Sequence, residues 1–192
     1  MKPNLTPIES LKNIESILND TQSVRTGASF YYVLWGIILF TYFFLNFLIT
    51  QFPLLQVSNL QSWMWIIFPV GGILSGLNKK KDLKKETVVS HFERVYFFAF
   101  TSFAISYGFV IIASFSLNKH LSLILFPMLL GITVYIVGGI TKHTPSILSG
   151  LLSVLLAIFS VFSSLELQFL FAALAALCSS FIPGILMKNK HV

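Results

Sequence analysis

The sequence predicts an all-α, polytopic membrane helix bundle with six transmembrane spans, preceded by a short amphipathic helix outside the membrane. Charged residues make up only 10% of the 192 residues, whereas a soluble domain carries about 25%. Hydrophobic residues make up 55%, and they gather in runs near the roughly 20 residues that a helix needs to cross a bilayer core. This composition excludes a disordered chain, a nucleic-acid binder and an ordinary soluble enzyme as leading classes.

Residues 1–26 precede the first apolar run and predict a cytoplasmic amphipathic helix. Thr6, Pro7 and Glu9 match a capping box, with Thr6 as the N-cap and Pro7 as the first helical residue. Three acidic residues against one lysine give residues 6–21 a net charge of −2, which is a poor match to a lipid-binding basic helix. We therefore expect its apolar face to dock on the basic loop of this chain or on another protein. That face consists of Ile8, Leu11, Ile14, Ile17 and Leu18.

Six apolar runs separated by polar breaks predict the membrane bundle, which covers residues 27–187. The first run is too long for the core of a signal peptide, so we expect it to remain as a permanent span. The break before the last span is so short that the last two spans must be antiparallel neighbours. The predicted spans are 27–50, 60–77, 93–117, 121–141, 146–164 and 166–187, and a cytoplasmic tail follows at 188–192.

Lysine and arginine concentrate on alternate breaks, which predicts the orientation. The break after the second span contains Lys79, Lys80, Lys81, Lys84 and Lys85, whereas Lys119 is the one basic residue in the breaks assigned to the opposite side. Cytoplasmic loops carry the excess of Lys and Arg, so we expect a multi-pass inner-membrane protein with both termini in the cytoplasm. The same five lysines are candidates for contact with anionic lipid headgroups of the bilayer, at about 1 kcal/mol each.

Small residues recur along several spans and have two interpretations. Membrane helices associate through small residues that let backbones approach closely, so these positions predict helix-packing seams. Alternatively, their serines line a path for a small solute. The second span carries a GxxxG pair at Gly72 and Gly76. The other members are Ser102 and Ser106 in the third span and Gly150, Ser153, Ala157 and Ser160 in the fifth.

The sequence also predicts which chemistry is missing. No Asp, Glu, Lys, Arg or His lies near the centre of any span, whereas proton relays and ion-coupled transporters usually carry such a group. The four histidines lie at span edges, and no catalytic, P-loop or dinucleotide motif is present. We therefore expect no enzymatic activity, no metal and no cofactor. Three prolines inside spans, Pro69, Pro127 and Pro183, are candidate hinges because each removes a backbone hydrogen bond.

Four segments are rich in the Gly, Pro and aromatic positions that shape helices. They are SFYYVLWG at 29–36, PVGGILSG at 69–76, FPMLLGITVYIVGGITKHTPSILSGLLSV at 126–154 and FIPGILMK at 181–188. On these segments, which lie along most of the chain, the sequence resembles a group of small, uncharacterised six-span bacterial integral membrane proteins. The resemblance implies the six-span fold. It implies no activity, because none of these motifs is a catalytic signature.

The leading functional prediction is a non-enzymatic membrane subunit with a regulatory or scaffolding role. It would act through protein–protein contacts, as a homo-oligomer or with another protein. The alternative is a channel or facilitator for a small neutral or weakly polar solute, which would use the serines together with Tyr107 and Tyr135 and could run between protomers. A lipid-handling role for the basic loop is a third reading. The first two differ in whether the serines face packed helices or face one another around water.

Overall fold

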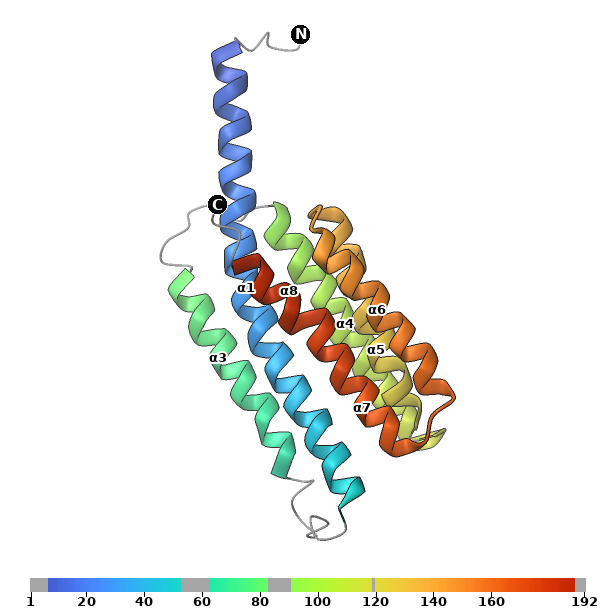
Figure 1. The fold of residues 1–192 in the computed structure, drawn as a ribbon. Coiled ribbons are helices and arrows are strands. Elements are labelled where there is room, and N and C mark those ends of the chain that lie inside the picture. The colour runs from blue at the N-terminus through green and yellow to red at the C-terminus, as the bar shows by residue number, and fades with distance from the viewer. Residues whose placement is uncertain (1–6, 53–62, 83–90, 119, 189–192) are drawn as a thin grey trace.

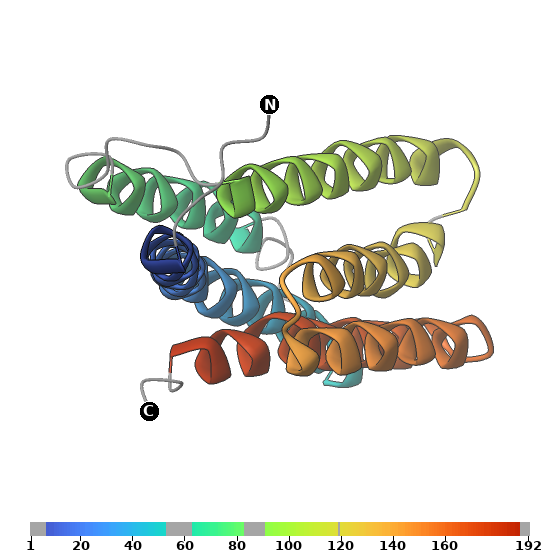
Figure 2. The same ribbon diagram turned by 90° about the horizontal axis from the view of Figure 1, so that it is seen from above.

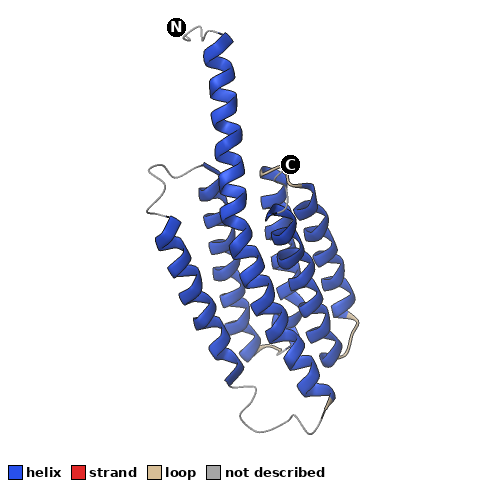
Figure 3. Ribbon diagram, turned by 60° about the vertical axis from the view of Figure 1, so that its left-hand side comes forward, coloured by secondary structure: helices blue, strands red, loops and turns tan. Residues whose placement is uncertain are grey.

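The computed structural model describes residues 7–52, 63–82, 91–118 and 120–188, which are helical almost throughout and contain no strand. A 3-10 turn, η2 (Met64–Ile66), precedes α3, and a π-helical segment, η3 (Leu177–Phe181), joins α7 to α8. Figure 3 shows the helices running side by side along one direction. They are α1 (Pro7–Gln51), α3 (Ile67–Asp82), α4 (His91–Ser116), α5 (His120–Ile140), α6 (Thr144–Val161), α7 (Leu165–Ala176) and α8 (Ile182–Lys188).

Five helical stretches are long and apolar enough to cross a membrane. Each stretch begins and ends within a few residues of a predicted span, because polar residues bound the apolar part of each helix. The prediction of an all-helical, multi-pass membrane protein is confirmed at this level. The five stretches are Ala28–Gln51, Arg94–Ser116, His120–Ile140, Thr144–Val161 and Leu165–Lys188.

The predicted span at 60–77 corresponds to a shorter helix. The apolar stretch described there is Met64–Asn78, which is roughly 24 Å long from the rises of its 3-10 and α-helical parts. A bilayer core is about 30 Å thick, so this stretch falls short of it by itself. Residues 53–62, which include the start of the predicted span, lie outside the described residues.

The N-terminal amphipathic helix and the first span form one helix, whereas the sequence analysis treated them as two elements. α1 runs from Pro7 to Gln51 without a break, and its first half projects beyond the rest of the bundle (Figure 1). Gly27 is the only strong helix breaker near the junction, and a single glycine disfavours a helix by only about 1 kcal/mol. We call residues 7–27 the stalk; the structure describes its backbone.

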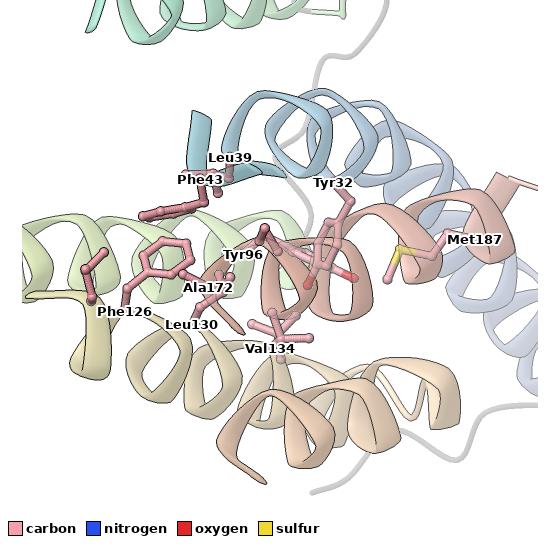
Figure 4. Packing of buried hydrophobic residues seen from close by; sticks show 13 residues of the cluster. Tyr32, Leu39, Phe43, Tyr96, Phe126, Leu130, Val134, Ala172 and Met187 are labelled. Atoms are coloured by element: carbon pink, nitrogen blue, oxygen red, sulfur yellow. The ribbon is translucent and has the colours of Figure 1, made fainter. Parts of the chain in front are cut away.

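α1 and α5 lie between α3 and α4 on one side and α6, α7 and α8 on the other (Figure 2). The core is formed where α1, α5 and α7 meet, and α4 adds to it (Figure 4). Phe43 and Phe126 are both buried, and their ring centroids lie 4.5 Å apart. Other core residues are Tyr32 and Leu39 of α1, Tyr96 of α4, Leu130, Val134 and Val137 of α5, and Ala172, Ala173 and Ala176 of α7. The alanines let the large side chains of α1 and α5 fill the space beside α7.

Candidate functional site

The most extensive helix contact joins α5 to α6, and glycines make it possible. A Cβ atom added to Gly150 would lie 2.6 Å from the backbone nitrogen of Tyr135 and 2.7 Å from the carbonyl oxygen of Gly131. A Cβ atom added to Gly138 would lie 2.8 Å from the backbone nitrogen of Ile147. These separations are shorter than real Cβ contacts. A larger residue at Gly131, Gly138 or Gly150 would therefore push the two helices apart.

The face of α6 that packs into the bundle consists of small residues at every third or fourth position. Ser153 donates a 2.9 Å hydrogen bond from Oγ to the carbonyl oxygen of Pro127 on α5. Ser149 bonds within its own helix, to the carbonyl oxygen of Ser146 at 3.1 Å. Both hydroxyl groups and both carbonyl oxygens belong to packed helices. The buried residues of this face are Ser146, Ser149, Gly150, Ser153, Ala157 and Ser160.

A second close contact joins α1 to η3 and α8, and the sequence analysis did not identify it. A Cβ atom on Gly36 would lie 2.6 Å from the backbone nitrogen of Phe181, and one on Gly184 would lie 2.9 Å from that of Val33. Ser29 donates a 2.7 Å hydrogen bond to the carbonyl oxygen of Gly184. The sequence did contain one indication of this contact, the small residues Ser29 and Gly36, which are seven positions apart in α1. The large aromatic residues around them obscured it.

The three candidate hinge prolines have different surroundings. Pro69 is exposed in the first turn of α3, shortly after η2. Pro127 is buried inside α5, and its carbonyl oxygen accepts the hydrogen bond from Ser153. Pro183 is buried in α8 directly after η3, whose wider turn makes room for the proline ring. Pro127 and Pro183 thus belong to the packed interior.

Gln168 ties the ends of three helices together. Its side chain is buried in α7, and Nε2 donates hydrogen bonds to the carbonyl oxygens of Ser160 and Ser163, both at 3.2 Å. Its Oε1 lies 3.0 Å from Nδ1 of His120 at the start of α5. A side-chain amide is both donor and acceptor, so this one residue joins the α6–α7 turn to α5.

A three-residue turn, residues 141–143, joins the other end of α5 to α6. Lys142 has a φ of 51°, and the N–H groups of Lys142 and His143 donate to the carbonyl oxygens of Gly139 and Gly138 at 3.3 and 2.9 Å. This is the Schellman pattern, in which glycine usually takes the left-handed position. The His143 side chain is 1% exposed, and its Nδ1 lies 2.8 Å from Oγ of Ser146. His143 is therefore part of the packed turn.

The GxxxG pair of α3 lies on an open face. A Cβ atom added to Gly72 or Gly76 would meet no atom of the described chain within 4 Å, whereas one added to Gly71 would contact the side chain of Ile38 on α1. Among the helices of the described ranges, α3 makes its main contact with α1. The side of α3 that carries Gly72 and Gly76 thus faces away from the bundle.

α4 is also largely open. In its most apolar stretch only 6% of the residues are buried, compared with 44% in α5. Ser102 and Ser106 are exposed, as is Tyr135 of α5, while Tyr107 stacks on Phe103 with ring centroids 5.9 Å apart. The structure therefore brings the α6 members of the predicted set together and leaves the α4 serines apart from them, so the two groups do not line a common path within one copy.

The basic loop is described only in part. Lys79, Lys80 and Lys81 belong to the last turns of α3, which ends at Asp82. Lys84 and Lys85 lie outside the described residues, and so does any docking of the stalk on this loop.

Within the described ranges, no group of three or more His, Cys, Asp and Glu residues is placed to hold a metal ion. Comparisons with protein-family models, with curated proteins and with solved structures found no match to this chain. The structural features that bear on function are the two closed seams (α5–α6, and α1 with η3 and α8), the open faces of α3 and α4, and the projecting stalk.

Proposed function

We propose that the chain is a six-span protein of the bacterial inner membrane with both termini in the cytoplasm. The path of the chain supports six crossings: α1, α4 and α6 run away from the end where the stalk projects, and α3, α5 and α7–α8 run back toward it (Figure 1). The sixth crossing would be the predicted span at 60–77, of which the stretch Met64–Asn78 is described. The concentration of lysine and arginine on alternate breaks supports the cytoplasmic placement of the termini.

We further propose a non-enzymatic subunit with a regulatory or scaffolding role, which acts through contacts with other proteins in the membrane. One observation carries this proposal: the open GxxxG face of α3. Inside the bundle, a Cβ atom added to Gly131 or Gly150 would lie within 3 Å of a neighbouring backbone. Gly72 and Gly76 offer the same kind of surface with no described atom opposite. Membrane helices associate through such surfaces, so α3 is suited to receive a helix from a second copy or from a partner protein.

Apolar exposure alone would not support a partner, because lipid tails are as apolar as leucine and satisfy such a face. The small residues are what distinguish α3, since they permit close backbone approach that lipid cannot exploit. α3 contacts the bundle mainly through α1. This fits the proposed role, because a partner helix can pack on the outer side of α3 without displacing a neighbour.

The test uses native mass spectrometry on protein extracted gently from its own membrane. The double variant Gly72→Leu, Gly76→Leu should lose the complex seen with the wild type and keep its fold, since neither glycine touches another described helix. Gly139→Leu is the matched control: Gly139 is also open, but it is not part of a GxxxG pair. A wild-type protein that is recovered only as a bare monomer, or a double variant that keeps its complex, would overturn the proposal.

A further inference from the structure

Two tyrosines from different helices meet in the core, near the end of the bundle from which the stalk projects. Tyr32 of α1 and Tyr96 of α4 are both buried, and their rings lie edge to face with centroids 6.0 Å apart. Their hydroxyl ends point toward the part of the chain where α7 passes into α8 (Figure 4), and the two phenols interact electrostatically. Among the α4 side chains whose burial is described, Tyr96 is the one large side chain that is buried in the bundle.

The hydroxyl group of Tyr32 has no hydrogen-bond partner among the described residues, although the side chain is only 3% exposed. Its neighbours are apolar: the ring of Phe100 lies 5.4 Å away between centroids, and Val134 and Met187 belong to the same core cluster. A buried hydroxyl group that bonds to nothing destabilises a fold, whereas phenylalanine would fill almost the same space without that cost. We therefore expect this hydroxyl group to bind a partner that is not a side chain.

The chain offers a hydrogen-bond acceptor on the same side of α1. Pro183 has no backbone N–H, so a carbonyl oxygen in the preceding turn, within η3, lacks the donor that an unbroken helix would supply. The next residue, Gly184, packs against Tyr32, since a Cβ atom added to it would lie 2.9 Å from Cβ of Tyr32. The proline turn and Tyr32 are therefore adjacent. In membrane helices, ordered water is one of the partners that satisfy the backbone groups freed by a proline.

We propose that a single water molecule binds between α1, α4 and η3 and joins these three elements. It accepts a hydrogen bond from the hydroxyl group of Tyr32, and it donates to the hydroxyl oxygen of Tyr96 and to a carbonyl oxygen of η3. A buried water molecule typically makes about three hydrogen bonds, and a phenol oxygen is both donor and acceptor, so these groups satisfy it.

The water site gives α4 a polar attachment to the bundle. Most of α4 is open, and Tyr96 is its large buried anchor among the described side chains. A water-mediated bridge from Tyr96 to Tyr32 holds this end of α4 against α1 by hydrogen bonds in addition to packing. The site lies inside the bundle and goes beyond the proposed function, since it does not depend on the open face of α3.

Thermal unfolding of the full chain in detergent tests the bridge through the sign of the change. Tyr32→Phe should lower the unfolding temperature by about 2–4 °C, which corresponds to the loss of one hydrogen bond in a protein of this size. A hydroxyl group without a partner predicts the opposite, because its removal would raise the unfolding temperature. Tyr135→Phe is the matched control and should change nothing, since Tyr135 is 45% exposed. A rise or no change for Tyr32→Phe would overturn the inference.

A double variant tests whether one water molecule joins both phenols. Tyr96→Phe alone should also lower the unfolding temperature. Tyr32→Phe combined with Tyr96→Phe should lower it by less than the sum of the two single changes, because the second change meets a bridge that is already broken. Shifts that simply add would show that the two hydroxyl groups do not share a ligand.

Radiolytic hydroxyl-radical labelling detects the water molecule itself, because a radical formed from a bound water oxidises the side chain beside it. Tyr32 should be labelled several-fold faster than Phe43, an aromatic side chain of the same core that is 2% exposed. Equally slow labelling of Tyr32 and Phe43 would overturn the inference. The Gly72→Leu, Gly76→Leu variant should label Tyr32 as the wild type does, so this measurement is separate from the test of the proposed function.

Discussion

The α5–α6 seam and the outer face of α3 are built from the same kinds of residue and have opposite environments. In the seam, Gly131 and Gly150 approach a neighbouring backbone so closely that no Cβ atom fits. On α3, Gly72 and Gly76 have open space within 4 Å in the described structure. The comparison teaches that a stripe of small residues marks a face able to pack closely, while the presence of a neighbour depends on the rest of the fold. The unfilled face is where a partner is expected.

The largest difference between the two regions should come from Gly150→Leu. The new side chain would collide with the backbone of α5, so we expect a loss of roughly 3 kcal/mol in the free energy of unfolding, at the upper end for overpacked sites. Gly76→Leu on the open face should change it by no more than about 0.5 kcal/mol. Thermal unfolding of both variants in the same detergent checks this. Similar losses in the two variants would show that the faces do not differ.

Substitution of a buried and an exposed serine makes the same comparison between a closed and an open face. Ser153→Leu should lower stability by roughly 2 kcal/mol, because the larger side chain has no room beside Pro127 of α5 and the hydrogen bond to its carbonyl oxygen is lost. Ser106→Leu on the exposed side of α4 should have little effect. The yield of folded protein after gel filtration measures both. A Ser153→Leu protein that stays folded while a solute flux disappears would instead favour a pathway.

Gln168→Leu tests whether the turn end of the seam is held by a polar network. The change removes hydrogen bonds to two carbonyl oxygens and the contact with His120, so we expect a loss of about 1.5 kcal/mol. Gln51→Leu, at the exposed end of α1, is the control and should have almost no effect. Chemical denaturation followed by tryptophan fluorescence provides the measurement. An unchanged midpoint for Gln168→Leu would mean that packing alone holds this end.

The smallest expected effect has the opposite sign. Lys142 occupies the left-handed position of the α5–α6 turn with a φ of 51°, where a side chain is disfavoured by about 1 kcal/mol relative to glycine. Lys142→Gly should therefore raise the unfolding temperature, while Lys142→Ala, which keeps a Cβ atom, should not. Differential scanning calorimetry of the two variants compares them. A gain in both would point to the lysine charge rather than to the backbone.

Much of the helical architecture followed from the sequence because it depends on local properties. Apolar runs of membrane length end at polar residues, and the helices at 94–116 and 120–140 end where these runs do. The spacing of small residues in the fifth predicted span was also visible, since it repeats every three or four positions. The junction of α1 was not visible: the polar residues before Gly27 suggested a break, but nothing there disfavours a helix strongly enough to end it.

The candidate site was harder to predict because its elements depend on distant parts of the chain. Ser29 and Gly184 are 155 positions apart, and their hydrogen bond exists only because α1 and α8 cross closely. The separation of the α4 serines from the α6 serines likewise depends on how the helices are arranged around the core. No pattern within α4 indicates that Ser102 and Ser106 lie on its exposed side.

The sequence by itself determined that this protein is helical, that it carries several membrane-length apolar helices and which faces of them are small enough for close packing. These are properties of a run of twenty residues or of a helical repeat, and they need no knowledge of neighbours. Only the tertiary structure decided which small-residue faces are closed and which are open. The physical reason is that close packing requires two backbones, and the sequence of one helix does not show which backbone lies opposite it.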